Sequence, residues 1–251
     1  MTMQKKIFRT FRAFTVISLI TMMIAMILSF GGCSVGSVEG RGEMVSRDFS
    51  VEAFNAVNFS GPYNVTWQQG SNFVLTVEMQ QNLFDYFQHS VRNGTLYIEF
   101  SRSITVRGNN TPRIYITAPY IQSANFSGAV DTVGWDTINI EQFALNVSGA
   151  GNINLDLEVG EFNLTASGAA DVTLRGNADT ARMMISGAGD ISAENLQIKD
   201  ATLNMSGVGN ADINVSDNLD VTLSGVGNIR YRGDPTVTQN VSGLGSVRRM
   251  D

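Results

Sequence analysis

The sequence predicts an all-β protein folded as a right-handed parallel β-helix, a solenoid with about 19 residues in each coil. Three observations support this class: a motif that returns at a nearly constant interval, alternating apolar and polar residues on both sides of it, and glycine within it. The motif is Ser-Gly-x-Gly-Asn or a close variant, and its successive serines are 21, 19, 19, 20, 18 and 18 residues apart. These serines are Ser127, Ser148, Ser167, Ser186, Ser206, Ser224 and Ser242.

The residues around each motif alternate with the period of a strand. Before Ser148, Leu145 and Val147 are apolar and Asn146 between them is polar, and the same alternation resumes after the motif in Ile153-Asn154-Leu155. A period of two places alternate side chains on opposite faces of a strand, whereas a helix has a period of 3.6. The motif therefore forms a tight corner between two strands of one coil, with the apolar positions directed inward.

The second residue of every motif is glycine. We expect these corner glycines to have positive φ and to lie close to the backbone of the adjacent coil, where a Cβ would be obstructed. They are Gly128, Gly149, Gly168, Gly187, Gly207, Gly225 and Gly243.

The fifth residue of the motif forms a second column of side chains on stacked coils: Asp131, Asn152, Asp171, Asp190, Asn210 and Asn228, followed by Ser246. Asn and Asp suit turns, so the favoured interpretation is a structural hydrogen-bonded ladder. One alternative is a calcium site, although the calcium-binding nonapeptide repeats that it resembles return every nine residues. Another is a glycosidase-like carboxylate pair formed by Asp171 and Asp190 on adjacent coils. We expect no metal and no cofactor.

The N-terminal segment predicts export. Residues 1–32 carry four basic residues followed by an uncharged apolar run, as a signal peptide does. Cys33, the sole cysteine, then occupies the place of a lipidated N-terminal cysteine, and residues 33–47 suit a flexible tether. An uncleaved transmembrane anchor and a chance cysteine after an ordinary signal peptide stay open as alternatives, and all three interpretations export the domain.

Composition limits the partners and the sources of stability. Without the signal, 13 Lys and Arg residues stand against 23 Asp and Glu residues, so the surface repels nucleic acid. A lone cysteine permits no internal disulfide. Stability must therefore come from stacked strands and the apolar interior between them.

Residues 48–120 predict an N-terminal β cap with the first coils, and residues 121–251 the β-helix repeats. Within the cap, Leu83, Phe84 and Phe87 are spaced as on a helix, so we expect a short helix over residues 80–91. This segment contains His89, the only histidine, which we interpret as partly buried among aromatic residues and not as a catalyst. Asn93-Gly94 then predicts a hairpin turn.

Several features together carry a resemblance to a known family. They are the Phe-x-x-Val…Ser-Gly opening, the Asn-Gly-x-Leu-x-Ile strand at residues 93–98, Ile-Thr-Ala-Pro at residues 116–119 and the serial Ser-Gly-x-Gly-Asn corners. Over residues 48–247 the chain resembles the putative auto-transporter adhesin, head GIN domain family. The resemblance implies a fold similar to the pectin lyase-like right-handed β-helices, a role in cell adhesion and no established catalytic residues. Many such proteins look like exported lipoproteins of Gram-negative bacteria.

The leading functional hypothesis is an exported, lipid-anchored binding or adhesion module of the cell envelope, placed at the outer membrane and meeting a glycan or protein ligand at the cell exterior. A structural envelope lipoprotein is the first alternative. A carbohydrate-active enzyme is the second, and no nucleic acid partner is expected.

Overall fold

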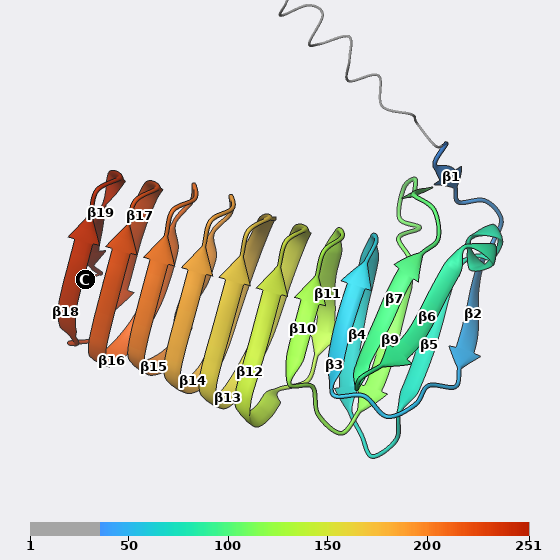
Figure 1. Cartoon of the computed structure of the whole chain (residues 1–251), viewed down its shortest axis with the longest axis horizontal. Helices are drawn as coiled ribbons and strands as arrows, with labels where there is room; N and C mark the ends of the chain where they lie inside the picture. The colour runs from blue at the N-terminus through green and yellow to red at the C-terminus, as the bar shows by residue number, and fades with distance from the viewer. Residues whose placement is uncertain (1–35, 251) are drawn as a thin grey trace, which may run out of the picture. The chain divides into compact units, whose positions relative to one another are not determined.

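The computed structural model describes residues 36–250, in which residues from Val38 onward form one compact unit. The unit consists almost entirely of strands (Figure 1). These elements are β1 (Val38–Glu39), β2 (Met44–Phe49), β3 (Ala56–Ser60), β4 (Tyr63–Gln69), β5 (Val74–Gln80), the 3₁₀ helix η1 (Gln81–Asp85), β6 (Phe87–Arg92), β7 (Thr95–Phe100), β8 (Ile104–Thr105), β9 (Arg113–Ala118), β10 (Ser123–Phe126), β11 (Val130–Trp135), β12 (Ile138–Val147), β13 (Ala150–Ala166), β14 (Ala169–Ile185), β15 (Ile191–Met205), β16 (Ala211–Leu223), β17 (Val226–Arg232), β18 (Thr236–Val241) and β19 (Leu244–Arg249).

The predicted solenoid is confirmed. From β10 onward, the strands of each coil pair in parallel with those of the next coil, and β13 pairs with β14 over almost their whole lengths. The register joins residues 19 apart, as in Leu164 with Met183. Each complete coil therefore advances the chain along the solenoid axis by one strand spacing, about 4.8 Å.

The core is the channel enclosed by the inward-facing residues. Leu145, Leu164, Met183, Leu203 and Val221 occupy equivalent positions on successive coils, and each is at most 1% exposed. Full burial of such a side chain stabilises the fold by about 1.5 to 3 kcal/mol. The apolar half of the sequence alternation thus provides a continuous interior without disulfides.

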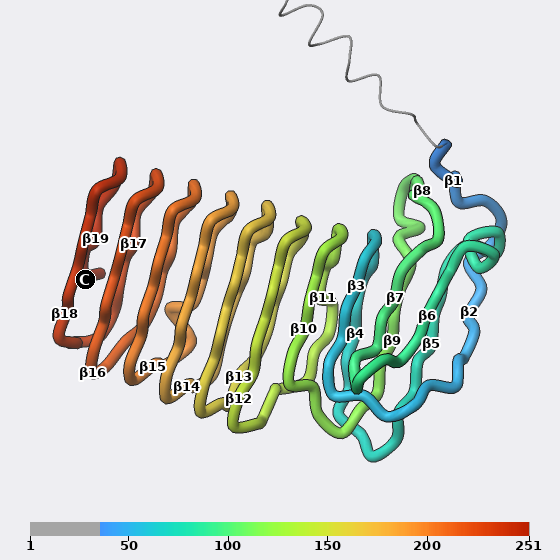
Figure 2. The backbone as a smooth tube through the Cα atoms, viewed as in Figure 1, coloured from blue at the N-terminus to red at the C-terminus, as the bar shows by residue number. Residues whose placement is uncertain are grey.

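The coils at the N-terminal end do not follow chain order. β3 lies between β10 and β7, and β4 lies between β11 and β9, so the coil made by β7 and β9 is outside the coil made by β3 and β4 (Figure 2). The chain leaves the solenoid after β4, forms the outer coil, and returns past the earlier coil to begin β10. Antiparallel pairing of β6 with β7, and of β5 with β9 and β2, closes this end.

The predicted helix over residues 80–91 is wrong for most of its length. Only the short 3₁₀ helix η1 is helical, and it buries Leu83 and Phe84. Residues 87–92 form β6 instead, because the turn at Asn93 (φ 50°) and Gly94 (φ 73°) folds them back antiparallel to β7. The apolar spacing fitted a helix, but tertiary pairing determined the structure.

Two parts of the expected tether, residues 38–39 and 44–47, lie in strands. β1 pairs in parallel with β8 and β2 pairs antiparallel with β5, and Val45 and Phe49 pack against the core. Glu39 accepts a hydrogen bond from Arg107, which lowers the pKa of the Glu39 carboxyl below its usual value. Cys33 and the predicted signal peptide lie outside the described residues. Within residues 36–250, no helix has the length and hydropathy needed to cross a membrane.

Candidate functional site

The corner motifs use glycine at two positions for two different reasons. At the second position, a Cβ on Gly187 would lie 1.9 Å from the carbonyl oxygen of Gly168 in the preceding coil. At the fourth position, Gly189 has φ of 137° and its Cβ would lie 2.2 Å from the oxygen of Ala170. The expected positive φ at the second position is wrong, since left-handed backbone occurs at the fourth position. The second position requires glycine for close approach alone.

The fifth motif residues form a column in which side-chain oxygens accept backbone hydrogen bonds from the following coil. Asp171 Oδ1 accepts from the Asp190 amide at 2.9 Å, and Asp190 Oδ1 accepts from the Asn210 amide at 2.7 Å. The same contact joins Asp131 to Asn152 at 2.7 Å and Asn210 to Asn228 at 3.1 Å. The column therefore joins one coil to the next, and the carboxylates of Asp171 and Asp190 take part in it.

Other candidate chemistry has a structural explanation. His89 lies on β6 with its ring 4.6 Å from that of Phe49 and 5.8 Å from that of Phe87, and burial lowers the pKa of the imidazole. Among residues 36–250, no group of three or more His, Cys, Asp or Glu side chains is placed to hold a metal ion.

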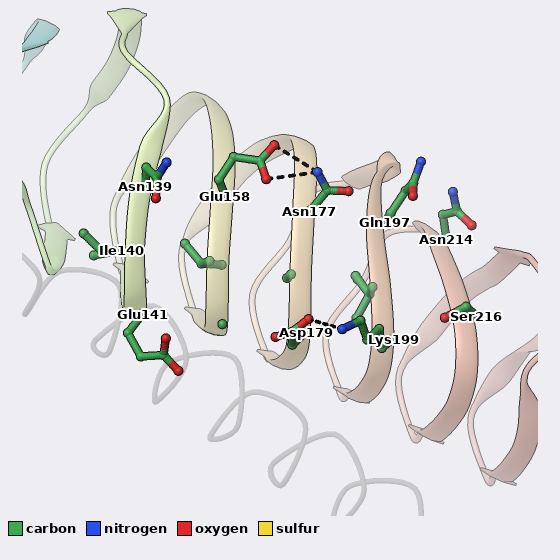
Figure 3. Close-up of a pocket in the computed structure, with 14 residues that line it drawn as sticks. Asn139, Ile140, Glu141, Glu158, Asn177, Asp179, Gln197, Lys199, Asn214 and Ser216 are labelled. Carbon is green, nitrogen blue, oxygen red and sulfur yellow. Dashed lines mark hydrogen bonds and ion pairs between the residues drawn. The ribbon is translucent and has the colours of Figure 1, made fainter.

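The structure instead reveals a groove on the side of the coils remote from the corner motifs. It has a volume of about 680 Å³ and crosses β12 to β16 (Figure 3). Its lining residues are Asn139, Ile140, Glu141, Glu158, Val159, Gly160, Asn177, Ala178, Asp179, Gln197, Ile198, Lys199, Asn214 and Ser216.

One wall of the groove is a row of amides and a carboxylate. Asn139, Glu158, Asn177, Gln197 and Asn214 follow one another in register on successive strands. Asn177 Nδ2 donates to both carboxylate oxygens of Glu158, at 2.9 and 3.0 Å. Within residues 36–250, no side-chain hydrogen bond is made by the amides of Asn139, Gln197 and Asn214. These amides can each offer both a donor and an acceptor to a ligand.

The opposite wall carries charge. Lys199 Nζ lies 2.6 Å from Asp179 Oδ1, and this carboxylate raises the pKa of the Lys199 ammonium. Glu141 and Ser216 continue the wall on either side (Figure 3). Between the two walls lies the backbone of Ile140, Val159, Ala178 and Ile198. The side chains of Val159, Ala178 and Ile198 face the interior and are at most 8% exposed.

Sequence reasoning missed this groove, although the sequence does carry a trace of it. Glu158, Asn177 and Gln197 each stand at a polar position between two inward-facing residues on the strand that follows the corner. The pattern gives only the outward direction of these side chains. The hollow itself arises where the strand pairing is interrupted: Glu141, Asp179 and Lys199 have no partner in the register of adjacent strands.

Comparisons with known proteins place the fold. The model of the putative auto-transporter adhesin, head GIN domain family matches residues 53–235. No curated protein matches the chain. The crystal structure of a putative adhesin from Bacteroides fragilis NCTC 9343 has a TM-score of 0.81 and 26% identity, covering 85% of this chain and 100% of that chain.

Two structures from Parabacteroides distasonis ATCC 8503 are also similar. A putative adhesin has a TM-score of 0.68 and 25% identity, covering 86% of this chain and 100% of its own. A putative lipid binding protein has a TM-score of 0.67 and 20% identity with the same coverage, and this likeness concerns the fold alone.

Proposed function

The chain belongs to the putative auto-transporter adhesin, head GIN domain family, and we propose that it is an exported lipoprotein of the cell envelope that binds an extended glycan without catalysis. The observation that carries the ligand class is the set of three groove amides, Asn139, Gln197 and Asn214, that make no side-chain hydrogen bond within residues 36–250. Sugar hydroxyls both donate and accept hydrogen bonds, as amides do.

The geometry of the groove favours a linear polymer over a compact ligand. The groove crosses five consecutive strands, and neighbouring strands repeat about every 4.8 Å. A chain of sugars lying across the coils would meet a polar side chain from each coil in turn. Many weak contacts of this kind would give useful avidity although each contributes only about 1 kcal/mol.

A glycan-binding screen with the purified protein tests the ligand class. Gln197→Ala should weaken binding of a captured glycan about fivefold, the equivalent of one lost hydrogen bond. Asn204→Ala is the matched control, because Asn204 is an exposed amide on the same strand that lies outside the groove. Equal binding by both variants would reject the groove, and new reducing ends during incubation would reject the non-catalytic assignment.

Lipid anchoring is tested separately. The proposal rests on Cys33 following an apolar signal-like run as the only cysteine of the chain. Cys33→Ser should abolish metabolic labelling with palmitate and leave an unprocessed precursor, because no other thiol can replace it. Unchanged labelling would exclude lipidation at this residue.

A further inference from the structure

The corner motifs present an apolar column that changes along the solenoid. Their third residues are joined coil to coil, from Ala129 through Ala188 to Val208, Val226 and Leu244. The last three are large and exposed, at 58%, 47% and 77% respectively. Exposed apolar side chains that lie contiguously on a soluble surface mark a place of contact.

The charge of the motifs changes at the same coils. Three of the first four motifs have Asp as their fifth residue, the exception being Asn152, whereas the last three have the uncharged Asn210, Asn228 and Ser246. Arginine appears just beyond: Arg248 donates to Ser246 Oγ at 2.9 Å. Two independent substitutions along the chain, Ala to Val or Leu and Asp to Asn or Ser, thus both lower the cost of placing this edge against lipid.

The start of the folded unit lies at this same edge. β1 pairs with β8 through Val38 and Ile104. Ile104 in turn lines a small hollow together with the corner residues Gly61 and Gly128. Figure 1 shows β1 and the corners of the coils along one edge of the unit. Val38 is only five positions after Cys33, a reach of at most about 18 Å.

We propose that the corner edge lies against the lipid surface in which Cys33 is anchored, with Val208, Val226 and Leu244 entering the boundary between headgroups and acyl chains. This inference rests on the proposed lipidation of Cys33. The short connection ties the N-terminal end of the edge to the bilayer, and the apolar side chains supply a second contact at the other end. An acyl anchor combined with a second membrane contact holds a protein more firmly than the anchor alone.

The orientation has a consequence for the groove. Asp217 is nine residues from both Val208 and Val226, so it lies on the opposite side of the coil from the two corners. Its neighbour Ser216 lines the groove. With the corners on the membrane, the groove faces away from it and is open to a polymer in the surrounding solution.

The test uses the full lipidated chain in vesicles of phosphatidylethanolamine and phosphatidylglycerol. A cysteine is introduced at the edge (Val226→Cys, or Leu244→Cys as an independent second site) or opposite it (Asp217→Cys) and is labelled with an environment-sensitive fluorophore. A lipidated Cys33 has no free thiol, so labelling is confined to the new site. Brominated acyl chains, which quench nearby fluorophores, are then compared with ordinary ones.

We expect brominated lipid to reduce emission from positions 226 and 244 and to leave emission from position 217 unchanged. Equal quenching at all three positions, or none at 226 and 244 in protein that floats with the vesicles, overturns the orientation while leaving the lipoprotein proposal standing. Emission from position 226 that shifts to the blue with rising protein concentration, equally in brominated and ordinary lipid, would show that the edge contacts a second copy of the chain. This result would also overturn the proposed orientation. If the protein with Cys33 intact does not float, both the anchor and the orientation fail.

Discussion

Replacing Gly187 by alanine should destabilise the solenoid by about 3 to 5 kcal/mol, because the new Cβ would lie 1.9 Å from the Gly168 carbonyl oxygen. Non-bonded atoms do not approach so closely, so the two coils would have to separate by about 1 Å. The obstructing atom belongs to the backbone and cannot move aside as a side chain would. Overpacking of this kind costs about 1 to 3 kcal/mol.

The separation would also stretch hydrogen bonds between the coils. The amide of Ala188 donates to Gly168 O at 2.9 Å, and the amide of Gly187 donates to Ala166 O at 3.3 Å. Each contributes about 1 kcal/mol, which accounts for the remainder of the expected loss. Thermal unfolding followed by circular dichroism should show a melting temperature lower by roughly 10 °C.

Two other glycines separate the possible causes. Gly134 has no left-handed φ, and a Cβ there would meet Thr66 Cγ2 at an ordinary 3.5 Å, so Gly134→Ala should be neutral or stabilising by up to about 1 kcal/mol. Gly108 has φ of 63° with open space around it, so Gly108→Ala should cost about 1 kcal/mol from backbone conformation alone. If the Gly187→Ala and Gly134→Ala variants have the same melting temperature, the coils do not approach each other as described and the reasoning is refuted.

Three further substitutions test other parts of the fold by thermal unfolding. Asp190→Ala removes the acceptor of the Asn210 amide and should lower the stability by about 1 kcal/mol. Asp190→Asn keeps an acceptor oxygen and should lower it much less. Equal losses in both variants would show that this hydrogen bond does not stabilise the coils. Tyr63→Phe should be neutral or stabilising, because the buried Tyr63 hydroxyl has no hydrogen-bond partner within residues 36–250, and a clear loss of stability would reveal an unseen partner. Burial lowers the pKa of the His89 imidazole in the folded protein below the ordinary 6.5. Between that lowered pKa and pH 6.5 the unfolded chain binds more protons than the folded chain, so the stability should fall as the pH drops below about 6.5. His89→Phe keeps the aromatic packing and should make the melting temperature less sensitive to pH there; an unchanged slope would exclude His89 as its source.

The solenoid could be predicted from the sequence because its two determinants are local and repeated. The interval between serines gives the coil, and alternation such as Leu145-Asn146-Val147 gives the inward face. The motif also located the corner. Position 187 requires glycine only because the backbone of the adjacent coil lies so close to it. Only the backbone of the adjacent coil could reveal that distinction.

The N-terminal end could not be predicted in the same way. The strand character of residues 56–60 and 95–100 is readable, but alternation does not state which coil lies beside which. The order of β7, β3 and β10 in space depends on pairing between residues far apart in the sequence. The spacing of Leu83, Phe84 and Phe87 is likewise ambiguous until the hairpin at Asn93-Gly94 fixes β6 as a strand.

The groove could not be predicted because its residues are not separated from the motif by a constant number of positions in the sequence. Glu158 and Asn177 follow the serine of their motif by 10 residues, Gln197 by 11 and Asn214 by 8. The differences arise at irregularities in pairing, between Thr173 and Arg175 of β14 and between Ala193 and Gln197 of β15. The number of residues from the motif therefore differs among side chains that the fold brings into one row.

The same irregularity suits the proposed position of ligand contacts on the far side of the coil. At the corner, the backbone of one coil touches that of the next, so neither an added residue nor a Cβ can be accommodated there. Variation in coil length must be absorbed elsewhere, and the irregular pairing of β15 shows it on the strand that leads from the corner to the groove. Side chains there can change in type and position without disturbing the stack. A solenoid with rigid corners can thus hold its coils together along one edge and vary its ligand contacts along the other.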